Sequence, residues 1–223
     1  SFQKKLITFH FLFDIYRTIS LYLGMTRGRP QEFNRETALG KAMDLFWSQG
    51  FEATGMQALT EHMGISRQSL YNTFGDKHSL LKEAIGHYNR QLCTKWSEIL
   101  LATGSPLKNM DRFFEVMESY TQTKDFRGCL MANTALEMGN RDPVIQKLLK
   151  KSGSQLDKLI EETLNKAVHN GELEVSVDTC SMARFILNNI RGVMVTKKGG
   201  GSKSEIGDIF DSLRMHLGQF QVK

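Results

Sequence analysis

The chain has 223 residues, and 29 Lys and Arg against 24 Asp and Glu give it a formal net charge of +5. Its three cysteines are odd in number and widely spaced, which excludes a disulfide framework and a paired-cysteine metal site. We therefore expect a cytoplasmic protein of one or two domains, with no metal, no cofactor and no membrane partner.

The first 24 residues, SFQKKLITFHFLFDIYRTISLYLG, are apolar and aromatic. His10, Asp14 and Arg17 interrupt the run and no small-residue cleavage site follows, so neither export nor a membrane span is expected. Two interpretations stay open for residues 1–24. They form either an extension upstream of a start at Met25, from a misplaced start or from cloning, or an accessory helix that packs on the body or occupies an apolar groove.

Three short helices are predicted next in the chain. Apolar residues recur at helical spacing over 34–50, and further helices are expected over about 54–62 and 66–74. The last two are separated only by a turn around Gly64. Glycine suits such a turn because it adopts the left-handed backbone conformation that lets two helices cross steeply.

Capping residues and prolines divide the rest of the chain into six further helices. Asp76, Asp178 and Ser202 are placed as N-caps, the last in a capping box with Glu205, and Pro106 opens another helix. No segment has the pattern of a strand. The chain is therefore predicted to be all-α with about nine helices.

The third short helix lies in GISRQSLYNTFGDK, residues 64–77, and carries too many polar side chains to be explained by folding alone. Ser66 is placed as its N-cap, Ile65, Leu70 and Phe74 supply its core contacts, and the remaining side chains face outward. A recognition helix in the major groove explains them, because hydrogen-bonding side chains read base edges. Charge does not support this interpretation, since residues 25–80 hold six basic and six acidic residues.

The stretch FEATGMQALTEHMGISRQSLYNTFGDKHSLL resembles the DNA-binding head of the TetR family of bacterial transcriptional repressors. The match covers about residues 33–82 and includes the L-Y-x-x-F-x-x-K ending that closes at Lys77. Thr60 stands where the family usually has Ala. The resemblance implies a helix-turn-helix head at 25–80 and a helical body at 81–223 that binds a small effector and dimerises.

The resemblance also assigns contacts with double-stranded operator DNA. Arg67 suits guanine and Gln68 suits adenine, while Thr54 and Lys77 would hold phosphates. Tyr71 is alternatively part of the core, and Lys77 an ordinary surface lysine. Arg27 and Arg29 would form a basic arm that reaches the minor groove; alternatively, they belong only to a solvated tail. The full predicted set is Arg27, Arg29, Thr54, Ser66, Arg67, Gln68, Ser69, Tyr71, Asn72 and Lys77.

Apolar stripes in 182–193 and 206–217 are candidates for a four-helix interface between two copies of the chain. The alternative is that these stripes pack inside one protomer. The predicted interface residues are Phe185, Ile186, Asn189, Val193, Ile206, Ile209, Phe210, Leu213 and Leu217.

An effector pocket is expected between the head and the dimer helices, where aromatic and methionine side chains gather. In a plain helical bundle these side chains are simply core. Asn133 and Glu137, one helical turn apart, are candidate polar anchors. The predicted pocket residues are Trp96, Phe113, Met117, Tyr120, Cys129, Asn133 and Glu137.

The resulting hypothesis is a homodimeric repressor that a small molecule of unknown identity releases from its operator. One alternative is a sensor of electrophiles or oxidants that acts through Cys129, which begins a predicted helix near Arg127. Another is an activator that binds DNA without a ligand. No catalytic residue is assigned, because no H-E-x-x-H spacing, G-x-S-x-G elbow or phosphate loop occurs.

Overall fold

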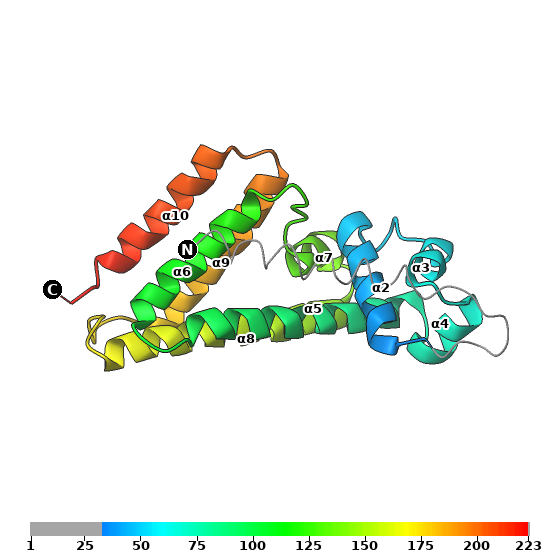
Figure 1. Cartoon of the computed structure of the whole chain (residues 1–223), viewed down its shortest axis with the longest axis horizontal. Helices are drawn as coiled ribbons and strands as arrows, with labels where there is room; N and C mark the ends of the chain where they lie inside the picture. The colour runs from blue at the N-terminus through cyan, green and yellow to red at the C-terminus, as the bar shows by residue number, and fades with distance from the viewer. Residues whose placement is uncertain (1–32, 223) are drawn as a thin grey trace, which may run out of the picture. The chain divides into compact units, whose positions relative to one another are not determined.

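The computed structural model describes residues 33–222, and the regular structure of this part is helical, as predicted (Figure 1). Leu173 and Gln221 add an isolated antiparallel bridge. The predictions for residues 1–24, for Arg27 and for Arg29 lie outside the described residues. The helices are α2 (Arg35–Gln49), α3 (Met56–Met63), α4 (Arg67–Phe74), α5 (Lys77–Leu100), α6 (Pro106–Thr121), α7 (Leu130–Met138), α8 (Pro143–His169), α9 (Thr179–Lys198) and α10 (Lys203–Gly218).

Short polar side chains begin most of these helices by accepting hydrogen bonds from free N–H groups of the first turn. The carboxylate of Asp76 accepts from the backbone N–H of Ser79 at 2.7 Å, and this bond lowers the pKa of Asp76 below its usual value. Ser202 and Glu205 form the predicted capping box. The side chains that cap a helix in this way are Asn34, Ser66, Asp76, Ser105, Asp142, Asp178 and Ser202.

Helices α2, α3 and α4 form the head around a small shared core. Leu59 of α3 and Leu70 of α4 are both fully buried. Between them, Gly64 has φ +71°, and its backbone N–H donates to the carbonyls of Thr60 and Glu61. A residue with a Cβ is strained at this φ, so glycine fixes the crossing of the two helices as predicted.

The long helix α5 extends from the head into the body, where it packs on α6 and α8 (Figure 1). Trp96 of α5 meets Phe113 of α6 edge to face, with ring centroids 4.7 Å apart. Phe114 continues the aromatic contacts to Phe210 of α10 at 6.3 Å. This chain of rings forms the core that joins the terminal helix to α5 and α6.

Candidate nucleic-acid interface

Helix α4 presents to solvent most of the side chains that are predicted to contact DNA. Arg67, Gln68 and Asn72 are exposed, and Tyr71 keeps 42% of its surface accessible. Ser69 is half-buried. The exposed Ser66 accepts a hydrogen bond from the backbone N–H of Ser69 at 3.0 Å and so caps the helix. Its predicted capping role is confirmed, and the outward face of α4 is polar.

The exposed side chains of α4 interact with one another at a spacing of four residues. Nη2 of Arg67 donates to the hydroxyl of Tyr71 at 3.4 Å, and its guanidinium lies 5.7 Å from the ring centroid. Nε2 of Gln68 donates to Oδ1 of Asn72 at 2.9 Å. Residues four apart share one face of a helix, so these two pairs form a single polar row.

Thr54 does not fit the phosphate contact predicted for it. Its side chain is fully buried, and its hydroxyl donates to the carbonyl of Gly50. Helix α3 also begins at Met56, two residues later than expected. The hydroxyl of Thr54 therefore closes the loop between α2 and α3, and the prediction of a phosphate contact through this side chain is corrected.

Lys77 is the first residue of α5 and lies half-exposed beside the head. Its Nζ atom is 4.3 Å from the ring centroid of Phe51, in the loop after α2. The aromatic face orients the ammonium group without neutralising its charge. A phosphate contact of Lys77 stays a prediction that this placement permits.

Glu137 was expected to anchor a ligand, but its carboxylate binds the head. Its two oxygens accept hydrogen bonds from the backbone N–H groups of Phe51, at 3.0 Å, and Glu52, at 2.8 Å. Gly50 makes room for this contact, because a Cβ there would lie 3.0 Å from Oε2 of Glu137. Gly50 also has φ +83° and ψ 173°, a conformation that essentially only glycine adopts. The prediction that Glu137 anchors a ligand is corrected.

Two further contacts tie the head to the body, and neither was predicted. Nη1 of Arg127 lies 3.2 Å from Oδ1 of Asp44 in α2, and its guanidinium lies 4.4 Å from the ring of Trp47. His78 in the first turn of α5 pairs with Asp142, which caps α8. The partners are far apart in sequence, so no local pattern marks them.

The other predicted pocket residues are packed or support a loop. Trp96, Phe113 and Met117 are buried in the core. The hydroxyl of Tyr120 donates to the carbonyl of Gly128 at 2.9 Å. Their part in an effector cavity stays a prediction.

Asn133 and Cys129 lie at the start of α7. Nδ2 of Asn133 donates to the carbonyl of Arg127 at 3.1 Å, so this amide supports the loop that leads into the helix. Cys129 is half-buried in the N-cap position and its thiol lies beside the hydroxyl of Tyr88. Burial, together with the neighbouring thiol, raises the pKa of Tyr88.

The apolar stripes of α9 and α10 mostly face the chain's own core. Six predicted interface residues are buried in the single chain and have little surface to offer a second copy, so the prediction is corrected for them. Of the others, Phe185 keeps 45% of its surface exposed, and Asn189 and Ile209 are half-buried. The six buried residues are Ile186, Val193, Ile206, Phe210, Leu213 and Leu217.

Within residues 33–222, no group of three or more His, Cys, Asp or Glu side chains is arranged to hold a metal ion. No helix in this part of the chain is long and apolar enough to cross a membrane. The polar row of α4 is an exposed face that the packing of the head does not use. A capped helix of this kind, set by a tight turn on a small core, defines a helix-turn-helix DNA-binding regulator.

Comparison with known proteins gives the family. Residues 38–84 match the bacterial regulatory proteins of the tetR family, and residues 106–209 match the tetracyclin repressor-like C-terminal domain. A regulator from Bacillus subtilis, YezE, is 31% identical over 161 residues, which cover 71% of this chain and 83% of the relative. The chain belongs to the TetR family of bacterial transcriptional regulators.

Two further relatives are similar over most of their length, and both are regulators rather than enzymes. The transcriptional repressor ComR of Escherichia coli K12 is 27% identical over 186 residues, covering 82% of this chain and 89% of the relative. A cysteine variant of the TetR family regulator CifR, solved with 26-base-pair double-strand operator DNA, superimposes with a TM-score of 0.76. It is 27% identical and is matched over its full length, covering 85% of this chain.

Proposed function

We propose that this chain is a homodimeric repressor that binds double-stranded operator DNA in the cytoplasm and is released by a small-molecule effector. The observation that carries the proposal is the polar row of α4, in which Arg67, Gln68, Tyr71 and Asn72 all face solvent. Guanidinium and amide groups of this kind form paired hydrogen bonds with guanine and adenine edges. The similarity to CifR, which was solved with operator DNA, supports the same use of the head.

We infer a dimer because one recognition helix reads too few base pairs of DNA by itself. Two heads on a two-fold axis read two half-sites whose centres lie about 34–36 Å apart, one turn of DNA. The exposed apolar side chains of the last two helices are suited to this contact. They include Phe185 and Val195 of α9 and Met215 of α10, which are 45%, 47% and 71% exposed.

A groove of about 260 Å³ lies between α9 and α10 at Phe185. The groove is lined by Phe185, Asn189, Asp208, Ile209, Ser212 and Leu213. In the proposed dimer, the same face of a second copy fills this groove, since a two-fold contact brings identical patches together.

Release from DNA follows from the contacts that join α7 to the head. Glu137 lies at the C-terminal end of α7 and Arg127 precedes its start, and both bind groups of the head or its connecting loop. A ligand that favours another position of α7 would therefore favour another position of the head. The two recognition helices would then no longer match successive major grooves, and the dimer would lose the advantage of binding with both heads.

The test is to select bound duplexes from a random library and measure their affinity by fluorescence anisotropy at fixed salt. We expect a palindromic site whose half-sites are 10–10.5 base pairs apart, or a multiple of that spacing. The double variant Arg67→Ala, Asn72→Ala should lose preference for this site while keeping its circular dichroism spectrum. Selection of duplexes with no common sequence would contradict the proposal.

A second candidate function is the sensing of electrophiles or oxidants through Cys129. The observation that favours it is the contact of this thiol with the hydroxyl of Tyr88, which joins the start of α7 to α5. A modified thiol would separate the two helices at this point. Cys129→Ser is then expected to bind operator normally but to ignore an added quinone or hypochlorite, and an unchanged response would refute this role.

Activation instead of repression is the remaining alternative. Deletion of the gene distinguishes the two, because loss of a repressor raises transcription from the operator and loss of an activator lowers it. A thermal-shift screen against metabolites tests whether any ligand binds, since a ligand of the folded state raises the melting temperature.

A further inference from the structure

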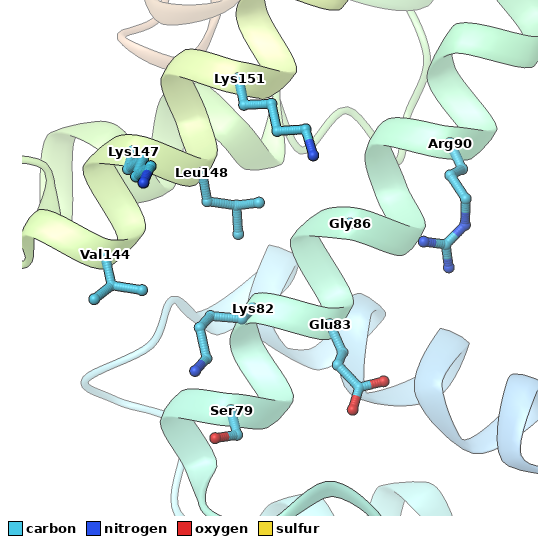
Figure 2. A pocket seen from close by; sticks show the side chains of 9 residues that line it. All are labelled: Ser79, Lys82, Glu83, Gly86, Arg90, Val144, Lys147, Leu148 and Lys151. Atoms are coloured by element: carbon cyan, nitrogen blue, oxygen red, sulfur yellow. The ribbon is translucent and has the colours of Figure 1, made fainter.

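An open groove of about 550 Å³ lies between α5 and α8, outside the contacts used in the proposed function (Figure 2). It begins beside Ser79, in the first turn of α5, and its other wall is the first part of α8. The volume is in the range of small-molecule sites. The groove is lined by Ser79, Lys82, Glu83, Gly86, Arg90, Val144, Lys147, Leu148 and Lys151.

Four cationic side chains surround this groove. Lys82 and Arg90 come from α5, and Lys147 and Lys151 come from α8 (Figure 2). In the part of the chain that the structure describes, none of the four forms an ion pair with a carboxylate. Clustered like charges raise the local concentration of anions.

The acidic residue of the groove does not offset this charge. The carboxylate of Glu83 lies 2.6 Å from Nη2 of Arg35, in the head helix α2. Its negative charge is therefore balanced from outside the groove. The four cations come from both walls of the groove, and its lining contains no other carboxylate.

The surface between the cations is apolar. Leu148 is half-buried, and Val144 keeps 54% of its surface exposed. Gly86 lies opposite Leu148, on the α5 wall of the groove (Figure 2). A Cβ at Gly86 would lie 3.6 Å from Nη1 of Arg90, which is an ordinary contact distance, so this guanidinium lies close to the bare backbone of Gly86.

We propose that this groove binds a small amphiphilic anion, in which a carboxylate or phosphate group is attached to an alkyl chain. The cations of the two helices hold the acidic group, and Val144 and Leu148 receive the chain. Such a ligand bridges the first turns of α5, directly after α4, to α8. The assignment of this groove as the effector site rests on the proposed function. Binding of the anion itself is measured without DNA.

Isothermal titration calorimetry on the full chain tests the ligand class with four probes. Decanoate and decyl phosphate carry both parts, decanol carries the chain alone, and inorganic phosphate carries the charge alone. We expect at least one of the two amphiphilic anions to bind, with decanol and inorganic phosphate at least about tenfold weaker. The preferred anion then identifies the acidic group. Equal binding of decanol, or binding of neither amphiphilic anion, overturns the proposal.

Variants locate the site. The double variant Lys82→Gln, Lys151→Gln should weaken binding of the anion by about tenfold, because each substitution removes one exposed charge contact. Gly86→Met keeps every charge and should abolish binding by occupying the groove. Lys150→Gln is the matched control, because Lys150 is exposed on α8 but does not line the groove. An equal loss in this control means adsorption to a basic surface and refutes the site.

Operator affinity of the same proteins separates this inference from the proposed function. Anion-free operator binding should be the same in wild type and in the double lysine variant. A loss in the variant would show that the groove holds DNA phosphates and would overturn the inference. Normal operator binding with no anion binding removes only the inference, and failure of the wild type to bind any operator removes only the proposed function.

Discussion

The carboxylate of Glu137 in α7 accepts a hydrogen bond from the backbone N–H of Phe51, 86 residues earlier in the chain, at 3.0 Å. A second bond from Glu52 makes the contact bidentate. Glu137→Ala leaves two N–H groups without this partner, so we expect the free energy of unfolding to fall by about 1–2 kcal/mol. Urea denaturation measures it, and Glu137→Gln, which keeps one acceptor oxygen, should lose less.

Glu115→Ala is the control for this change, because Glu115 is exposed on α6 and takes part in no contact with the head. It should leave the unfolding free energy within the usual range of surface substitutions, about ±0.5 kcal/mol. If the two alanine variants are equally stable, the contact of Glu137 with the head contributes nothing to folding.

Arg67 and Lys77 are expected to affect DNA binding in different ways. Arg67→Ala should cost about 1–3 kcal/mol on the selected operator and relax the preference at one base pair, because the proposed contact of this side chain is with a base edge. Lys77→Ala should weaken binding to all duplexes alike and reduce its salt dependence, since a phosphate contact carries no sequence information. Anisotropy titrations at several salt concentrations measure both effects.

Lys158→Ala removes the same charge from the exposed surface of α8 and serves as the control for Lys77. It should leave the affinity and its salt dependence unchanged. Unchanged operator affinity in both head variants would contradict the assignment of α4 as the recognition helix.

Substitutions at Met215 and Phe185 test the proposed dimer interface. Glutamate at either position places a charge at the centre of an apolar contact, and a buried unpaired charge is costly. We therefore expect Phe185→Glu and Met215→Glu to sediment as monomers at micromolar concentration while remaining folded. Val175→Glu is the matched control, because Val175 is 90% exposed in the segment between α8 and α9. Dimers in all three variants would place the interface elsewhere.

The ionisation of Asp142 makes the stability of the folded state depend on pH. Hydrogen bonds from the backbone N–H of Ile145 and from His78 hold the pKa of Asp142 below the ordinary value of 3.8. The folded state therefore binds this proton less readily than the unfolded state. The resulting stabilisation is complete above pH about 4 and is lost as the pH falls through the lower folded pKa.

Asp142→Asn keeps a capping side chain and removes the charge, so it isolates this effect. The variant should be less stable than wild type at pH 7, with the difference shrinking between pH 4 and pH 2 in urea titrations. Asp125→Asn changes an exposed residue outside the helices and should show no such difference. A stability difference that is constant with pH would mean that the ionised form of Asp142 is not the one stabilised.

Local chemistry made most of the helix boundaries predictable. Asp76, Asp178 and Ser202 cap helices in the structure because their oxygens satisfy N–H groups within three residues, and such bonds are visible in the sequence. Gly64 was predictable for the same reason, since its backbone conformation serves only the turn that contains it.

Side chains whose partners lie far along the chain were not predictable. The sequence shows that Thr54 is polar and near a helix start, but its burial depends on how α2 and α3 pack. Glu137 has the polarity of a ligand anchor, and only the fold brings the loop after α2 to its carboxylate. The stripes of α9 and α10 likewise do not reveal which apolar residues the chain's own core uses.

The hydrogen bonds between side chains of α4 in the free protein compete with the hydrogen bonds that the same side chains are proposed to form with operator DNA. In the proposed complex with operator, Arg67 and Gln68 each give up a partner on the same helix, Tyr71 or Asn72, to contact a base. A side chain gains nothing when it exchanges that internal partner for a base pair that offers only one poor hydrogen bond. In the proposed complex, two contacts within the eight residues of α4 therefore contribute to discrimination against wrong sequences.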